Sequence, residues 1–176
     1  LRGTAGSRNA RAAGAAAPSG PHCPSHPAPG RVEPMSETPV DAELDPTQRR
    51  IIGVLIERAL TTPDNYPLTV NALVAGCNQK SNRDPVMQVQ DFEVEGALRA
   101  LFVREWVTNT NAGGRAIKWR HRIDHKLGLE SAPAAVLAEL LLRGPQQPGE
   151  LRARAARMAP IATQEDLLQI LQVLMA

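Results

Sequence analysis

The stretch from Thr69 to Arg122 constrains the fold more than any other part of the chain. It begins with two helical repeats of apolar residues around a polar loop and ends with residues that alternate between apolar and polar. Apolar residues at i, i+3, i+4 and i+7 form one face of a helix, whereas a period of two is typical of a strand. The stretch therefore predicts helix, loop, helix and a two-stranded hairpin, which is the order of a winged helix-turn-helix.

Three helices are predicted in and before this stretch. The first begins after Asp45, which can cap it, and ends before Pro63. The second follows Thr69, and the third runs from about Asp91 to about Arg104. Their buried stripes are, in order, Ile52-Leu55-Ile56-Ala59, Val70-Leu73-Val74-Cys77 and Val94-Ala97-Leu98-Leu101.

The hairpin is predicted from residues 106–108 and 115–123, with Gly113-Gly114 in the turn between them. Alternation along the second strand places Ile117 and Trp119 on one face. The opposite face is expected to carry three cations, Lys118, Arg120 and Arg122. Such a face is either the solvated side of an amphipathic strand or a contact for phosphates.

The last part of the chain repeats the helical pattern over residues 131–143, 150–158 and 163–175, with no hairpin after it. The predicted fold class is therefore mainly α with a small β wing (α+β), arranged as two tandem winged helix-turn-helix domains. The expected boundaries are residues 44–123 for the first domain, 124–130 for a linker, and 131–176 for a second domain that is truncated before its C-terminal wing.

Residues 1–43 are predicted to be a disordered tail, because their Ala-, Gly-, Pro- and Arg-rich composition buries too little apolar surface to offset the entropy of ordering them. Met35 is interpreted as the natural start, and an organelle transit peptide is the alternative. The formal net charge of the chain is +2, and residues 1–34 hold four arginines and one glutamate, so the remaining residues carry −1. Total charge therefore says little about the folded part.

The sequence offers little basis for catalysis. It has no phosphate-binding glycine loop, zinc-binding cysteine cluster or glycine-flanked nucleophilic serine, so we expect no enzyme, metal, cofactor or small-molecule substrate. Cys23 and Cys77 do not indicate a disulfide framework, which fits a cytoplasmic protein. No apolar run approaches the roughly 18 residues of a membrane-spanning helix.

Two stretches, TTPDNYPLTVNALVAGCNQKSNRDPVM and LLLRGPQQPGELRARAARM, resemble the YceH family of uncharacterised bacterial proteins. The resemblance spans roughly Leu44 to Met175. It implies two tandem winged-helix domains that are often regarded as DNA-binding, with no established activity. The Ala- and Pro-rich residues 1–34 and the missing second hairpin depart from that pattern.

Two functions are consistent with these features. The first is a DNA-binding, transcription-regulator-like protein that contacts duplex DNA through a basic loop and the wing. Phosphate contacts are expected from Lys80, Arg83, Lys118, Arg120 and Arg122, and base-edge contacts or loop caps from Asn78, Gln79 and Asn82. Against it, the third helix begins with acidic residues, which repel phosphate. The alternative is a protein-interaction or homodimerisation module that does not bind DNA.

Overall fold

The computed structural model describes residues 43–111 and 116–176, which belong to one compact unit. The tail predicted over residues 1–43, apart from Glu43, lies outside the described residues, as do Met35, Cys23 and the predicted turn at Gly113-Gly114.

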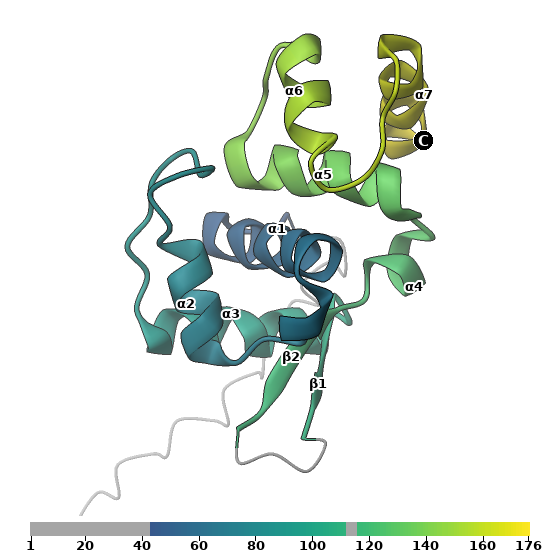
Figure 1. Cartoon of the computed structure of the whole chain (residues 1–176). Helices are drawn as coiled ribbons and strands as arrows, with labels where there is room; N and C mark the ends of the chain where they lie inside the picture. Colours follow the sequence, from purple (N-terminus) through teal and green to yellow (C-terminus); the bar gives the residue numbers. More distant parts are fainter. Residues whose placement is uncertain (1–42, 112–115) are drawn as a thin grey trace, which may run out of the picture. The chain divides into compact units, whose positions relative to one another are not determined.

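The described part of the chain is mainly helical, with one small antiparallel sheet of two strands (Figure 1). This confirms the predicted α+β class. The elements, in chain order, are α1 (Pro46–Thr61), the 3-10 helix η1 (Pro63–Asn65), α2 (Val70–Cys77), α3 (Asp91–Val103), β1 (Val107–Thr110), β2 (Lys118–His121), α4 (Ile123–Leu127), α5 (Ser131–Arg143), α6 (Pro148–Ala155) and α7 (Gln164–Met175). Among the described helices, none combines the length and apolar composition needed to cross a bilayer.

Side chains cap the starts of α1 and α2, as predicted. The Asp45 carboxylate accepts a hydrogen bond from the backbone N–H of Gln48 at 2.8 Å, and the backbone N–H of Asp45 donates to the side-chain oxygen of Gln48 at 3.2 Å. The Thr69 hydroxyl accepts from the backbone of α2 at 3.3 Å. Such caps satisfy backbone N–H groups that have no partner inside a helix.

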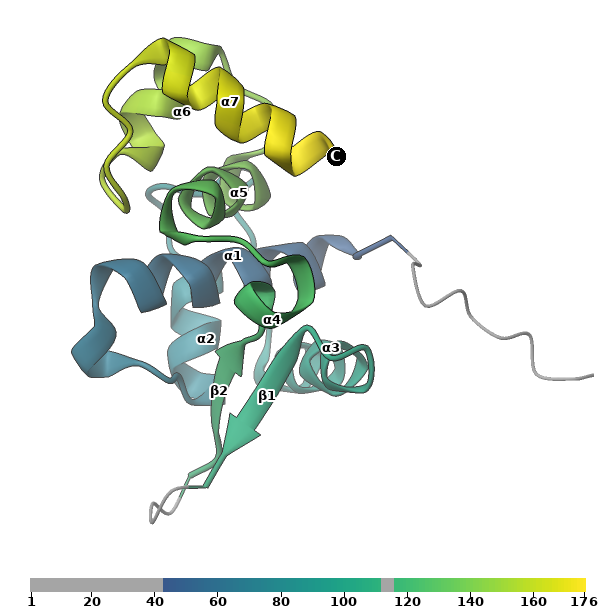
Figure 2. The ribbon, with the colours of Figure 1, turned by 90° about the vertical axis from the view of Figure 1, so that its right-hand side faces the viewer.

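Helix α1 lies between two layers of the fold, with α2 and α3 on one side and α5 on the other (Figures 1 and 2). Ile51 and Val54, outside the predicted stripe, are fully buried, whereas Ala59 within it is only half-buried. Val54 faces α2, where a Cβ on Gly76 would lie 2.7 Å from its Cγ1, whereas α5 packs on α1 at Gly53. A Cβ on Gly53 would lie 2.9 Å from Cγ of Leu142 in α5, so the two helix backbones approach unusually closely here.

Helix α5 contributes to two apolar clusters. Ala134, Ala138 and Leu142 join the large core built on α1, α2 and α3, while Val136 joins a smaller cluster with α6 and α7. The predicted linker at 124–130 contains most of α4, which ends at Gly128 with a φ of 63°. The predicted division into two domains at this linker remains a prediction.

The hairpin follows the predicted alternation, but its strands differ in extent. Asn109 and Thr110, expected in the turn, belong to β1 and pair with Trp119 and Lys118. Leu68 adds a bridge on the other edge of β2, donating to Trp119 at 3.0 Å and accepting from it at 2.7 Å. Trp119 is buried against the core, as expected.

Candidate functional site

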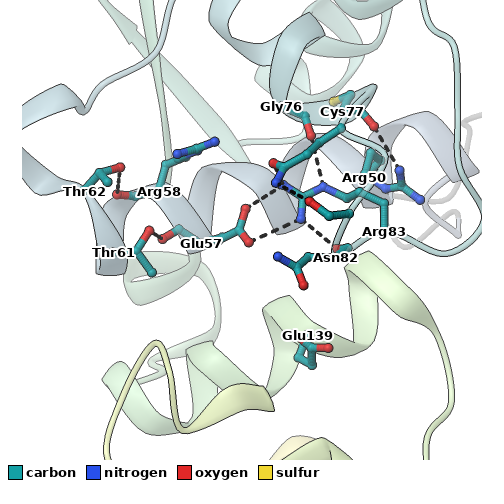
Figure 3. A network of polar contacts seen from close by, with 12 residues as sticks. Arg50, Glu57, Arg58, Thr61, Thr62, Gly76, Cys77, Asn82, Arg83 and Glu139 are labelled. Carbon is teal, nitrogen blue, oxygen red and sulfur yellow. Dashed lines mark hydrogen bonds and ion pairs between the residues drawn. The ribbon is translucent and has the colours of Figure 1, made fainter.

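The loop between α2 and α3 holds five of the residues considered for DNA contact, and it is anchored to the rest of the fold. Arg83 is the clearest case (Figure 3). Its side chain has no exposed surface and pairs with Glu57 of α1 at 2.6 Å. Its Nε also donates to the carbonyl of Gly76 at 3.0 Å. Arg83 therefore faces the interior, where it is not available to a phosphate.

Arg50 of α1 supports the same loop and was missed in the sequence. Its guanidinium donates to the carbonyl of Cys77 at 3.0 Å and to that of Pro85 at 2.7 Å. Burial, followed by the charge of Arg83, lowers the pKa of Arg50. The two guanidinium groups satisfy carbonyls at the C-terminal end of α2, where the helix dipole favours cations. The available signal was an arginine directly before the buried run that starts at Ile51.

The amide side chains of the loop are also engaged within the fold. Asn78 both donates to and accepts from the backbone of Val89, at 2.8 and 2.7 Å. Gln79 donates to Ser81 at 3.1 Å. These contacts match the loop-capping alternative for Asn78 and Gln79 more closely than base-edge readout.

Asn82 joins the loop to α5 and to the turn that follows α6. It adopts a φ of 59°, and its Oδ1 accepts hydrogen bonds from Arg143 and Arg157. Both arginines pair with the buried Glu139 of α5, at 3.0 and 3.8 Å. The loop is therefore attached to α5 and α6 as well as to α1.

The cations expected to bind phosphates are not brought together. Lys80 is exposed in the loop, and Lys118 and Arg120 are exposed on the hairpin. Arg122 is half-buried and pairs with Glu105 at 3.6 Å. The loop runs up beside α5, whereas the hairpin extends from the other side of α1, and both views agree on this (Figures 1 and 2). The loop that carries Lys80 therefore does not lie beside the described residues of the hairpin.

The outer face of α3 has a different character. Phe92, Gly96, Arg99 and Val103 follow at i, i+4, i+7 and i+11, so they share one side of the helix. Phe92 is 71% exposed and Val103 is 81% exposed. Large apolar side chains clustered at the surface are typical of interaction sites.

A groove of about 580 Å³ lies between this face and the hairpin. Its lining residues are Thr69, Val70, Asn71, Glu95, Arg99, Ala116, Ile117 and Trp119. Phe102 of α3 packs edge-on against Trp119, with ring centroids 6.1 Å apart, and Ile117 is 52% exposed. From α3 the groove is lined by Glu95 and Arg99, and its apolar lining comes from Val70, Ile117 and Trp119.

Acidic residues surround the first turns of α3. Asp91, Glu93 and Glu95 are all exposed, and Arg99 is the nearest cation on the same helix, 3.9 Å from Glu95. Helix α7 resembles α3 in this respect. It begins with Glu165 and Asp166, contains no Lys or Arg, and exposes three apolar side chains, Leu168, Val173 and Met175.

Cys77 lies in the core, and His121 is half-buried. Burial raises the pKa of the Cys77 thiol to about 11, which disfavours the nucleophilic thiolate. Burial also lowers the pKa of His121, whose Nδ1 accepts from the backbone of Ile123 at 3.4 Å. Among residues 43–111 and 116–176, no group of three or more His, Cys, Asp or Glu side chains is arranged to hold a metal ion.

A family model described as "Protein of unknown function, DUF480" matches residues 44–176. A UPF0502 protein of Geotalea daltonii is 47% identical over 137 residues, covering 78% of this chain and 63% of the relative. UPF0502 protein azo0627 of an Azoarcus species is 52% identical over 117 residues, covering 66% and 52%. The chain thus spans between half and two thirds of the length of these relatives.

Proposed function

The chain belongs to the DUF480 family of proteins of unknown function, and on that premise we propose that it is a winged-helix protein that binds another protein. The order α1–α2–α3–β1–β2, with the hairpin packed beside α3, supports the winged-helix assignment. Helices α5, α6 and α7 repeat the helical part and support a tandem arrangement. The binding surface is the outer face of α3 with the groove beside the hairpin.

The character of the α3 surface carries this proposal. A helix that reads DNA presents its N-terminal residues to base edges between two rows of phosphates. In α3 those residues include Asp91, Glu93 and Glu95, whose carboxylates would meet phosphates with like charge. Exposed aromatic and aliphatic side chains, such as Phe92 and Val103, instead suit the core of a protein interface.

The proposed role is binding rather than catalysis, in the cytoplasm. Burial of Cys77 and His121 removes two side chains that could act as a nucleophile or a general base. Cys77 is an unpaired thiol inside the core, which fits a reducing compartment.

Site-specific photocrosslinking tests the protein-binding role. A benzoylphenylalanine in place of Phe92 should capture a protein in cells, whereas the same group at Ala153, an exposed position on α6, should not. The captured protein, once purified, should bind the intact chain at least tenfold more tightly than the Val103→Asp variant. If the captured protein is a second copy of this chain, the bound partner is identified as the chain itself, in a homodimer. Equal capture at both positions, or no effect of Val103→Asp, would remove the proposal.

Duplex DNA is the second candidate, and one observation favours it. Lys118 and Arg120 are exposed beside their strand partners Thr110 and Thr108, which together form a polar, cationic face. With Lys80 added, about three phosphate contacts would give a salt slope of roughly −3 in log K against log salt. Fluorescence anisotropy of labelled duplex DNA measures this slope. Lys118→Glu with Arg120→Glu should abolish such binding, and no signal at micromolar protein and low salt would exclude it.

A further inference from the structure

We infer that the partner is a basic segment of another protein whose backbone crosses α3 at Gly96, with cationic side chains toward the start of α3 and an apolar side chain toward Val103. The inference rests on the protein-binding function proposed above and adds the chemistry of the partner. Three features carry it: an unexplained glycine, the flanking apolar side chains, and the distribution of charge.

Gly96 lies in the second turn of α3, where glycine is disfavoured relative to alanine because it loses more backbone entropy. Nothing inside the described fold requires it. A Cβ built at this position meets no atom within 4 Å, and the residue is exposed. Gly53 and Gly76 differ, because a Cβ there would lie 2.9 Å and 2.7 Å from neighbouring side chains. The missing side chain of Gly96 therefore leaves room for something outside the described chain.

Large apolar groups border this gap along the helix. Phe92 lies one turn before Gly96, and Val103 lies two turns after it, on the same side. At the hairpin side, Ile117 is 52% exposed and lines the groove of about 580 Å³, and Phe102, which is 46% exposed, packs against Trp119 of the same lining. A partner segment that lies across Gly96 can place an apolar side chain against Val103 and into this groove.

The charges around Gly96 select the sign of the partner. A second groove, of about 500 Å³, runs between the start of α1 and α3, and its lining includes Asp45, Glu93 and Gly96. Asp91 and Glu95 add further negative charge at the same end of the helix. Within α3 this set is opposed by Arg99 alone. A segment bearing Lys or Arg next to its apolar residue is therefore electrostatically complementary to this end.

A displayed library of random 16-residue peptides, selected against the intact chain, tests this chemistry directly. The selected peptides should be enriched in Lys and Arg near Leu, Phe or Trp. Their affinity should fall at least tenfold in Gly96→Gln, since glutamine is neutral and fills the gap without disturbing the helix. Gly149→Gln is the matched control, because Gly149 is also exposed and helical and a Cβ there likewise meets no atom within 4 Å.

The outcomes separate the partner chemistry from the function it rests on. Selected peptides that bind the Val103→Asp variant more weakly than the intact chain support the protein-binding function. If those peptides contain no excess of Lys and Arg, or bind the Gly96→Gln variant as tightly as the intact chain, this inference is overturned and the protein-binding function stands. If the selected peptides bind the Val103→Asp and Gly96→Gln variants as tightly as the intact chain, the inference and the protein-binding function are both overturned. The same holds if the selection enriches no peptides. Charge reversal at Glu93 and Glu95 should weaken the basic peptides at low salt and have less effect at high salt.

Discussion

Removing the buried guanidinium of Arg83 should destabilise the fold and leave surface properties unchanged. The substitution Arg83→Met keeps much of the length and apolar stem of the side chain while removing its charge and donors. Arg83 donates to both carboxylate oxygens of Glu57, at 3.2 and 2.6 Å, and to the carbonyls of Gly76 and Asn82, at 3.0 and 2.8 Å. Methionine can make none of these four hydrogen bonds.

The expected loss follows from what remains after the substitution. Breaking a fully buried ion pair by removing one partner costs about 3–5 kcal/mol. Because the Glu57 side chain is 18% exposed, its carboxylate can regain some hydration, which lowers that cost. The carbonyl of the buried Gly76 loses its donor, which adds about 1 kcal/mol or more. We therefore expect a net loss of about 2–4 kcal/mol in the free energy of unfolding.

Urea denaturation measures this loss. With a slope of about 2 kcal/mol per M, the midpoint should fall by about 1–2 M. Lys80→Met is the matched control, because Lys80 is an exposed cation in the same loop, and its midpoint should stay nearly unchanged. Adding Glu57→Met to Arg83→Met should recover part of the loss, since no unpaired carboxylate then remains. Equal, small shifts for Arg83→Met and Lys80→Met would refute the buried pairing.

Three further predictions use other sites. Gly53→Ala should lower stability by about 1–2 kcal/mol, because its Cβ would meet a leucine of α5 at 2.9 Å. Gly96→Ala should raise stability by about 0.5–1 kcal/mol, because alanine is favoured over glycine in a helix. Thermal unfolding measures both changes. Because burial lowers the pKa of His121, protonation favours the unfolded chain, so stability should fall as pH drops below about 6.5, and His121→Gln should flatten this part of a urea-midpoint profile. In a Cys23→Ser background, Cys77 should react with a thiol reagent at pH 8 far more slowly in the native protein than in urea, since its pKa is raised to about 11.

Local signals predicted most of the secondary structure. The starts of α1, α2 and α7 depend on Asp45, Thr69 and Thr163, whose side chains cap nearby backbone groups within three residues. The alternation around Trp119 likewise depends on neighbours along one strand. Interactions of this range are readable from a sequence because chain proximity already brings the partners together.

The burial of Ile51 and Val54 could not be predicted in the same way. Helical periodicity identified Ile52, Leu55 and Ile56, but the additional burial of Ile51 and Val54 depends on contacts with elements distant in sequence. An apolar helix that is covered on two sides has no clear one-sided stripe.

The candidate site was the least predictable part, and Arg83 shows why. A charged residue in a polar loop is normally exposed, so phosphate contact was a reasonable expectation. The partner that buries it, Glu57, lies 26 residues earlier on α1. No local pattern reports such a pairing. The exposed apolar residues of α3 were equally hidden, because Phe92 and Val103 become informative only once the core face of the helix is known.

The contacts that anchor the loop between α2 and α3 also connect the later helices to the start of α3. Asn82 accepts from Arg143 and Arg157, and the backbone N–H of Asp84 donates to the carbonyl of Leu142 at 3.0 Å. Further along the same loop, Asn78 holds Val89, the residue directly before the cap of α3. Helices α5 and α6 therefore restrain the segment that leads into α3, although they lie on the other side of α1. If the α3 face binds a protein, substitutions at Asn82, Arg143 or Arg157 will change binding by shifting α3, because these residues do not lie on the binding face.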